Sequence, residues 1–271
     1  AVPQSALGAI YRTRRAVVVG DPLQVEPVVT IPKVLIDILA DSTCVANEYK
    51  VIENSAQTFA DNINEFNGMI GERQVGCPLV VHRRCIEPMF SISNLISYDN
   101  RMFNKTNKKE EYLKPENPFL IKKSGWINVE GVENGGKDHF VKNQAERVCQ
   151  LMEDAVHIYS DLFETDDKIF IITPFRTVAE SMRKFIISYF SAKGYDKEIL
   201  SKWTKNCVGT VHTFQGKDAN EVLLVLGCSN KSAGAMNWVV KKANILNVAC
   251  TRAKYRIAFI GNINDWKNRR Y

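Results

Sequence analysis

From residue 126 onward, short apolar runs alternate with longer stretches in which apolar residues recur every three or four positions. An uninterrupted apolar run is typical of a strand buried on both faces, and the wider spacing is typical of an amphipathic helix. Strands separated by helices of this length form a parallel sheet covered on both faces, so the pattern predicts an α/β fold. Asn143 and Glu146 resemble a capping box at the start of the first of these helices. The predicted strands are 126–130, 168–173, 207–211, 222–226 and 256–260, and the predicted helices are about 143–162, 177–190 and 238–250.

The pattern before residue 126 is less regular. It favours short helices at 5–12, 31–40 and 56–65, and short strands at 16–19 and 79–81. The first strand runs directly into Gly20 and Asp21, with Gln24 close behind. Polar groups at the end of a buried strand are where open α/β sheets place ligand-contacting side chains. The alternative is an ordinary turn in which Asp21 and Gln24 bind the loop backbone, and these residues alone favour the turn.

Composition narrows the class of protein. The 271 residues are 45% hydrophobic and carry a net charge of +6, which suits a globular protein and permits a polyanionic partner. The seven cysteines form no CxxC pair and the four histidines have no metal-ligand spacing, so we expect no metal site and no disulfide framework. We read the cysteines as reduced thiols of a cytoplasmic protein. No apolar run is long enough to predict a membrane span.

Four segments carry groups suited to a phosphate-bearing ligand, and we expect them to meet at the carboxyl edge of the sheet. Gln24 can orient a water molecule or a phosphate oxygen. Arg83 and Arg252 present planar forks that match phosphate oxygens. Gly216 allows close approach of the backbone, and Asp218 can accept a hydrogen bond from a ribose hydroxyl. Each residue taken singly also has a structural explanation, such as a surface ion pair or a turn.

Five segments in order, "VVVGDPLQVEP", "HRRCIEPMF…SYDNRM", "ITPFRTVAESMRK", "VGTVHTFQGKDANEVLLVLG" and "LNVACTRAKYRIAFIGN", resemble successive motifs of the superfamily 1 helicases. The similarity is to the Upf1-like/Dna2-like branch, typified by the nonsense-mediated-decay and Okazaki-processing helicases. The first segment is similar to motif III, the fourth to motif V and the last to motif VI. The "HRRC" form departs from the commoner tyrosine-arginine-methionine-histidine pattern.

This resemblance implies a RecA-like P-loop NTPase fold and a role for each matching position. Gln24 would sense the γ-phosphate, and Arg83 and Arg252 would be arginine fingers. We expect the Arg252 side chain to project from the end of its helix toward the cleft between the two RecA-like domains. His82 stands where the family often has an aromatic residue that stacks on the base. The remaining nucleotide contacts would be Asp21, Gln215, Gly216 and Asp218. The contacts to the backbone of single-stranded DNA or RNA would be Thr173, Thr210 and His212.

Two parts of the family pattern are missing. The sequence has no GxxxxGK[ST] and no aspartate-glutamate pair ahead of motif III. We therefore expect a C-terminal motor fragment whose partner is the N-terminal half of the same polypeptide. Residues 1–80 would be the remnant of a first RecA-like domain and 81–271 a second. ATP and Mg²⁺ would bind the full-length helicase, with the fragment alone inactive and binding neither tightly. The alternatives are a non-catalytic nucleic-acid-binding module and an interaction scaffold.

Overall fold

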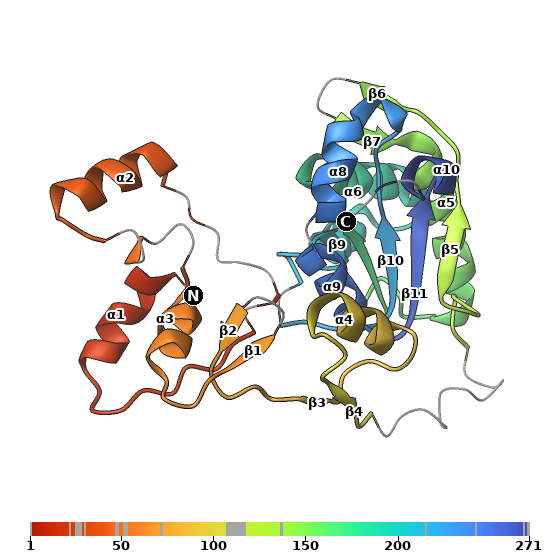
Figure 1. The fold of residues 1–271 in the computed structure, drawn as a ribbon. Helices are drawn as coiled ribbons and strands as arrows, with labels where there is room; N and C mark the ends of the chain where they lie inside the picture. Colours follow the sequence, from red (N-terminus) through yellow and green to blue (C-terminus); the bar gives the residue numbers. More distant parts are fainter. Residues whose placement is uncertain are drawn as a thin grey trace. The chain divides into compact units, whose positions relative to one another are not determined.

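The computed structural model describes residues 2–21, 23–24, 29, 31–46, 49–50, 54–70, 73–106, 118–135, 138–214, 216–241, 243–267 and 269 (Figure 1). The chain divides into two compact units, which we call unit 1 (Ala1–Val80) and unit 2 (Val81–Tyr271).

The described residues of unit 1 include three α-helices and a small hairpin. The helices are α1 (Pro3–Tyr11), α2 (Lys33–Ser42) and α3 (Ala56–Ile63), and the hairpin pairs β1 (Gly68–Ile70) with β2 (Arg73–Val75). Ser55 and Thr58 form a capping box that fixes the start of α3. The buried Asp61 of α3 accepts a hydrogen bond from the backbone N–H of Gly76 at 3.1 Å, which fastens the hairpin to the helix. The three predicted helices are confirmed.

The predicted strand at 16–19 is wrong. These residues have no regular secondary structure, and Val17 and Val19 are 89% and 80% exposed. A strand needs a neighbour to satisfy its backbone N–H and C=O groups. Among the described residues of unit 1, the strands are β1 and β2, and they pair with each other. The apolar run therefore has no sheet to join.

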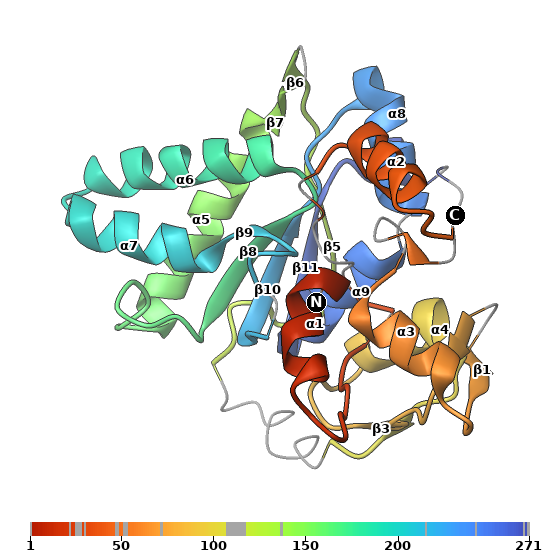
Figure 2. The same ribbon diagram turned by 90° about the vertical axis from the view of Figure 1, so that its left-hand side faces the viewer.

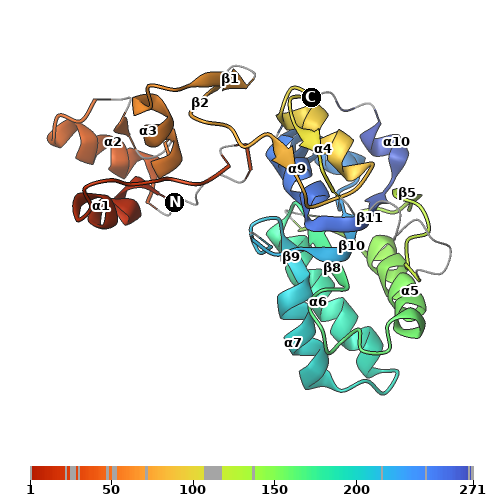
Figure 3. The same cartoon turned by 90° about the horizontal axis from the view of Figure 1, so that it is seen from below.

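Unit 2 is built on a five-stranded parallel sheet with the order β5-β11-β10-β8-β9. The strands are β5 (Gly125–Asn128), β8 (Ile169–Thr173), β9 (Val208–Thr210), β10 (Ala219–Val225) and β11 (Ala253–Gly261). Helices α4 (Met89–Ser97) and α9 (Ala243–Arg252) lie on one face, and α5 (Lys142–Ile158), α6 (Arg176–Ser191) and α7 (Lys197–Cys207) lie on the other (Figure 3). The predicted α/β fold with a parallel sheet is confirmed.

Two small sheets and three short helices complete unit 2. β3 (Val81–His82) pairs with β4 (Phe103–Asn104), and β6 (Glu133–Gly135) forms an antiparallel hairpin with β7 (Asp138–Val141). The short helices are η2 (Asn230–Ser232), α8 (Ala233–Lys241) and α10 (Ile263–Trp266). The predicted helix 238–250 is in fact the two helices α8 and α9.

Two other details differ from the sequence prediction. α7 was not predicted; it begins at the N-cap Asp196, whose carboxylate accepts from the next helical N–H groups, and it packs beside α6 (Figure 2). The capping box at Asn143 and Glu146 does not form, because α5 is capped by Val141 and Glu146 instead pairs with Lys142 one turn away at 3.2 Å.

Candidate functional site

The predicted site residues of unit 2 lie at two opposite edges of its sheet. In the register of β10 and β11, Ala219 lies opposite Ala253, so the residues just before them, Asp218 and Arg252, share the amino edge. The expectation that all these groups meet at the carboxyl edge is wrong. Residues 211–218 run from the carboxyl end of β9 to the amino end of β10, because the two strands are parallel.

A cluster of charges brings three of the motif segments together at the amino edge. The Asp218 carboxylate lies 2.7 Å from Lys254 Nζ and 3.9 Å from Arg84 Nε. The backbone N–H of Ile86 donates to the carbonyl of Lys254 at 3.1 Å, which ties the segment after β3 to the start of β11. Arg84 and Lys254 have 37% and 25% of their side chains exposed, so these two cations are accessible to an anionic ligand. The Asp218 carboxylate, which we predicted to accept a hydrogen bond from a ribose hydroxyl, already forms ion pairs with these two cations.

The two predicted arginine fingers differ sharply in environment. Arg83 is exposed, so its side chain is accessible from solvent. Arg252 is 1% exposed, and its Nη1 donates to the carbonyl of Lys217 at 2.8 Å. The guanidinium is buried in this conformation and joins the end of α9 to the segment that carries Asp218. Projection of Arg252 toward the interdomain cleft stays a prediction.

Gly216 shapes the turn that precedes Asp218. Its φ is +82°, in the left-handed region that glycine tolerates best, and a Cβ there would meet open space. The N–H of Lys217 closes the turn by donating to the carbonyl of Phe214 at 3.0 Å. The exposed backbone at Gly216 is thus accessible to a ligand. Gln215 lies outside the described residues.

His82 is half-buried and organises the loop that carries the two arginines. Its Nε2 accepts the N–H of Cys85 at 2.9 Å, and its ring centroid lies 5.3 Å from that of Phe90. An accepting Nε2 requires the neutral ring with its proton on Nδ1. Burial, followed by the positive charge of Arg84, lowers the pKa of His82 and favours the same state. Stacking of His82 on a base stays a prediction.

The carboxyl edge holds the predicted nucleic-acid contacts. Thr173 at the end of β8 lies opposite Thr210 at the end of β9. Thr173 is buried and its hydroxyl accepts from the N–H of Phe175 at 3.4 Å, whereas Thr210 is half-buried and His212 is exposed. Thr213 closes the turn after β9, because its hydroxyl accepts from the N–H of Thr210 at 3.2 Å. The structure thus brings these residues to one edge of unit 2.

In unit 1, Asp21 and Gln24 bind each other. Asp21 Oδ1 accepts the N–H of Leu23 at 2.9 Å, and Oδ2 accepts from the Gln24 amide at 3.0 Å. This is the turn that the residues alone favour. Contact of Gln24 with a γ-phosphate stays a prediction.

The AAA domain family matches residues 65–264. The chain belongs to this family. A regulator of nonsense transcripts 1 homolog of Arabidopsis thaliana is 33% identical over 50% of this chain and 10% of its own length. The DNA replication ATP-dependent helicase/nuclease DNA2 of Mus musculus is 24% identical over 96% of this chain and 24% of its own length. The probable helicase senataxin of Homo sapiens is 24% identical over 94% of this chain and 9% of its own length.

These matches confirm the resemblance to the Upf1-like branch of the superfamily 1 helicases and to a RecA-like P-loop NTPase fold. The chain spans about a quarter or less of the length of these relatives.

One segment of this helicase-family chain approaches the phosphate-binding pattern without completing it. Residues 131–138, "GVENGGKD", fit GxxxxGK but end in Asp138. A phosphate loop needs backbone N–H groups that converge at the start of a helix. Glu133–Gly135 and Asp138–Val141 instead form the antiparallel hairpin β6–β7. We therefore assign no phosphate loop here.

Arg84 and Lys254 are site residues that sequence reasoning missed. Both stand beside a predicted arginine, in "HRRC" and "TRAK". Asp218 could have indicated both residues, because a carboxylate is expected to form ion pairs with the cations of neighbouring basic segments.

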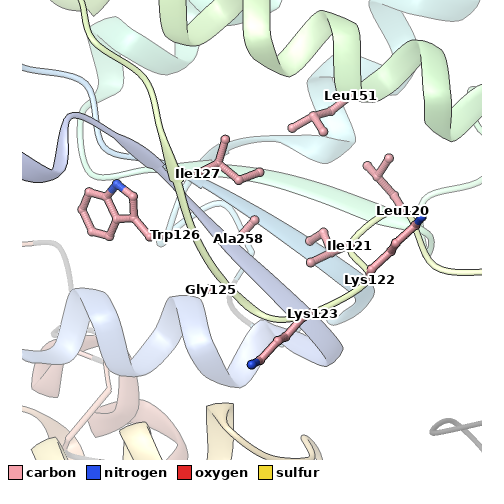
Figure 4. Close-up of a pocket in the computed structure, with 9 residues that line it drawn as sticks. All are labelled: Leu120, Ile121, Lys122, Lys123, Gly125, Trp126, Ile127, Leu151 and Ala258. Carbon is pink, nitrogen blue, oxygen red and sulfur yellow. The ribbon is translucent and has the colours of Figure 1, made fainter.

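A pocket of about 230 Å³ lies beside the edge strand β5, apart from these residues (Figure 4). Leu151 of α5 faces Ile127 across it, and Lys122 and Lys123 extend from the segment before β5. Its lining includes none of the predicted site residues. Among the described helices, none has the length and apolar character needed to span a bilayer.

Proposed function

We propose that this chain forms part of an ATP-dependent nucleic-acid helicase. Unit 2 would be the second RecA-like domain, and unit 1 would be the end of the first. The observation that carries the proposal is the separation of two sets of groups on one sheet. Cationic groups lie at the amino edge, and the threonines that match nucleic-acid-contacting positions lie at the carboxyl edge.

The amino edge suits the phosphates of ATP. Arg83 is exposed, and Arg84 and Lys254 have 37% and 25% of their side chains exposed. These cations would neutralise the negative charge of a bound triphosphate. Hydrolysis of that nucleotide would supply the free energy that drives movement of the helicase along the nucleic-acid strand. The donor set does not suit Mg²⁺, because the carboxylate of the cluster, Asp218, is paired with two cations. Mg²⁺ would be held by another part of the helicase.

Residues 211–218 supply a physical connection between the two edges. Phe214 is fully buried in the middle of this segment, and its ring stacks on Phe170 of β8 with centroids 4.3 Å apart. Asp218 at one end belongs to the charge cluster, and His212 at the other lies at the proposed nucleic-acid edge. A shift of the charge cluster on nucleotide hydrolysis would therefore be transmitted to the strand contacts.

Unit 1 would add Gln24 as a γ-phosphate sensor. Support comes from the exposed apolar side chains of Val17 and Val19, which precede the Asp21 turn. Apolar residues of this kind are buried in a complete parallel sheet. We propose that neighbouring strands of the full helicase pair with residues 16–19 and so place Gln24 at the end of a buried strand.

A non-catalytic nucleic-acid-binding module is the second candidate. It is supported by two of the expected catalytic side chains, which already form hydrogen bonds within the chain. Arg252 bonds the Lys217 carbonyl, and Gln24 bonds Asp21. The two candidates agree on nucleic-acid binding and differ on the nucleotide.

The test is binding of the chain to labelled single-stranded DNA and RNA over a salt series, with ATP turnover measured beside it. We expect weak binding that falls as salt rises, since phosphate contacts release counterions, and no turnover by the chain alone. His212→Ala should weaken binding, and His157→Ala, which removes another exposed histidine, should not. Salt-independent affinity, or equal effects of the two substitutions, would refute the nucleic-acid edge. Steady-state turnover by the chain alone would refute the assignment of the nucleotide's main binding groups to another part of the helicase.

A further inference from the structure

Three potential metal ligands converge near the carboxyl end of β10. They are Glu133 on β6, His139 on β7 and Cys228, three residues after β10, and their ligand atoms all lie within 4.8 Å of one another. The β6–β7 hairpin lies at the end of the sheet toward which the arrow of β10 points (Figure 1). Glu133 and Cys228 are 5% and 2% exposed, and His139 is half-buried. The ligand atoms are thus largely shielded from solvent.

The backbone holds Cys228 in place. Gly227 and Cys228 have φ values of +62° and +57°, and such a left-handed conformation is disfavoured for cysteine. The N–H of Cys228 donates to the carbonyl of His139 at 2.8 Å, and the N–H of Gly227 donates to the buried Gln144 side chain at 2.9 Å. A Cβ at position 227 would lie only 2.8 Å from the carbonyl of His139. The turn therefore presses Cys228 against the hairpin.

Other contacts orient the carboxylate. Glu133 Oε1 accepts from the Ser229 hydroxyl at 3.1 Å, and Oε2 lies 2.9 Å from His139 Nδ1. The Ser229 hydroxyl is thus an outer hydrogen-bond partner of the kind that orients ligands in metal sites, whereas the Glu133–His139 contact joins two of the potential ligands and would open to admit an ion. The ring of His139 is itself packed against Phe175, with centroids 4.6 Å apart.

We propose that Glu133, His139 and Cys228 form a binding site for a zinc-class divalent ion. Zn²⁺ binds well to a ligand set of carboxylate oxygen, imidazole nitrogen and thiolate sulfur. Mg²⁺ and Ca²⁺ prefer ligand sets made only of oxygen, so this set does not suit them. With three protein ligands, a water molecule would complete a tetrahedron. The proposal is independent of the proposed helicase function.

Such an ion would cross-link the β6–β7 hairpin to the end of β10. Through Phe175, which lies two residues after Thr173, it would also stiffen the carboxyl edge of the sheet. The competing explanation is that the Glu133–His139 hydrogen bond alone pins the hairpin and that the thiol of Cys228 only fills space.

The test is titration of the metal-free chain with Co²⁺ and then Zn²⁺. Cys44 and Cys77 are exposed and could bind metal adventitiously, so both are replaced by serine in every protein used. We expect one Co²⁺ per chain, a thiolate-to-cobalt absorption band, displacement by Zn²⁺, and a higher melting temperature with Zn²⁺. Cys228→Ser should abolish the band and weaken affinity by more than the roughly 10–100-fold that loss of an outer-shell partner costs. Cys149→Ser, which alters a buried cysteine of α5, is the matched control and should keep both.

His139→Gln keeps the proposal testable if Cys228→Ser fails to fold. The glutamine amide can still donate to Glu133, so a purely structural pin would survive, whereas metal affinity should fall as it does in Cys228→Ser. Circular dichroism checks the fold of each variant. Absence of a thiolate band in the parent protein, or an equal band in a folded Cys228→Ser or His139→Gln variant, would overturn the proposal.

Discussion

Replacing Arg252 with alanine separates a buried structural contact from a catalytic role. The substitution removes a guanidinium that is 1% exposed and that donates to the carbonyl of Lys217 at 2.8 Å. A hydrogen bond to a charged group contributes about 1.5–3 kcal/mol, and loss of the buried stem adds to that. We expect the free energy of unfolding to fall by about 2–4 kcal/mol. For a domain of this size, at about 2–4 °C per kcal/mol, the melting temperature should fall by about 4–16 °C.

Arg83→Ala is the matched control. Arg83 is exposed, so its replacement should change the free energy of unfolding by no more than about 0.5 kcal/mol. In the complete helicase that we propose, both substitutions should lower ATP turnover by about 10³–10⁵-fold, as removal of an arginine finger does. The pair therefore gives one variant that loses turnover alone and one that loses turnover and stability together.

Calorimetry of the chain and steady-state turnover of the complete helicase are the two assays. An Arg252→Ala chain that melts at the parent temperature would refute the structural contact. An Arg252→Ala helicase that melts early yet keeps most of its turnover would show that Arg252 is not a finger. Loss of stability in Arg83→Ala would show that our account of its exposure is wrong.

Two further predictions concern the same unit. Because the pKa of His82 is lowered in the folded chain, the unfolded chain takes up a proton at this site first as the pH falls, and the free energy of unfolding should decrease below pH 6.5 toward the folded-state pKa. Chemical unfolding measured across that pH range tests this. His82→Gln, whose amide oxygen can accept the Cys85 N–H, should flatten the pH dependence. Gly209→Ala would place a Cβ 2.6 Å from Thr213 Oγ1 and disturb the Thr210 turn, so the affinity for single-stranded nucleic acid should fall. The Cβ of Gly125→Ala would meet open space, so this control should leave the affinity unchanged in the same binding assay. Equal affinities for the two variants would count against nucleic-acid binding at the Thr210 edge.

The central strands of unit 2 could be predicted because they contain uninterrupted apolar runs that the sheet buries on both faces. β8, for example, is buried at all five positions. The same signal failed at 16–19, where the sequence supplies an apolar run but the described part of unit 1 supplies no neighbouring strand. Helix α7 carries a readable signal in Leu200, Trp203 and Cys207, which are buried at helical spacing. Its many intervening polar residues obscured that spacing.

The candidate site could be predicted residue by residue but not as an arrangement. Ordered motifs identified Asp218 and Arg252, yet their partners depend on the register of β10 against β11, which no local pattern encodes. The three potential metal ligands were still harder to predict from the sequence. Cys228 is far along the chain from Glu133 and His139, and only the fold brings the three side chains together.

The parallel topology would allow one sheet to bind the two ligands that we propose, one at each edge. A segment that leaves the carboxyl end of one strand and enters the amino end of another must travel the length of the sheet, as residues 211–218 do between β9 and β10. Polar groups at its two ends therefore reach opposite edges, while Phe214 anchors its middle on Phe170. The Thr213 turn fixes one end of this segment, and the Asp218 ion pairs hold the other. In the helicase that we propose, a change at one edge would be transmitted to the other through this anchored segment, which is the coupling that a motor on a nucleic-acid strand requires.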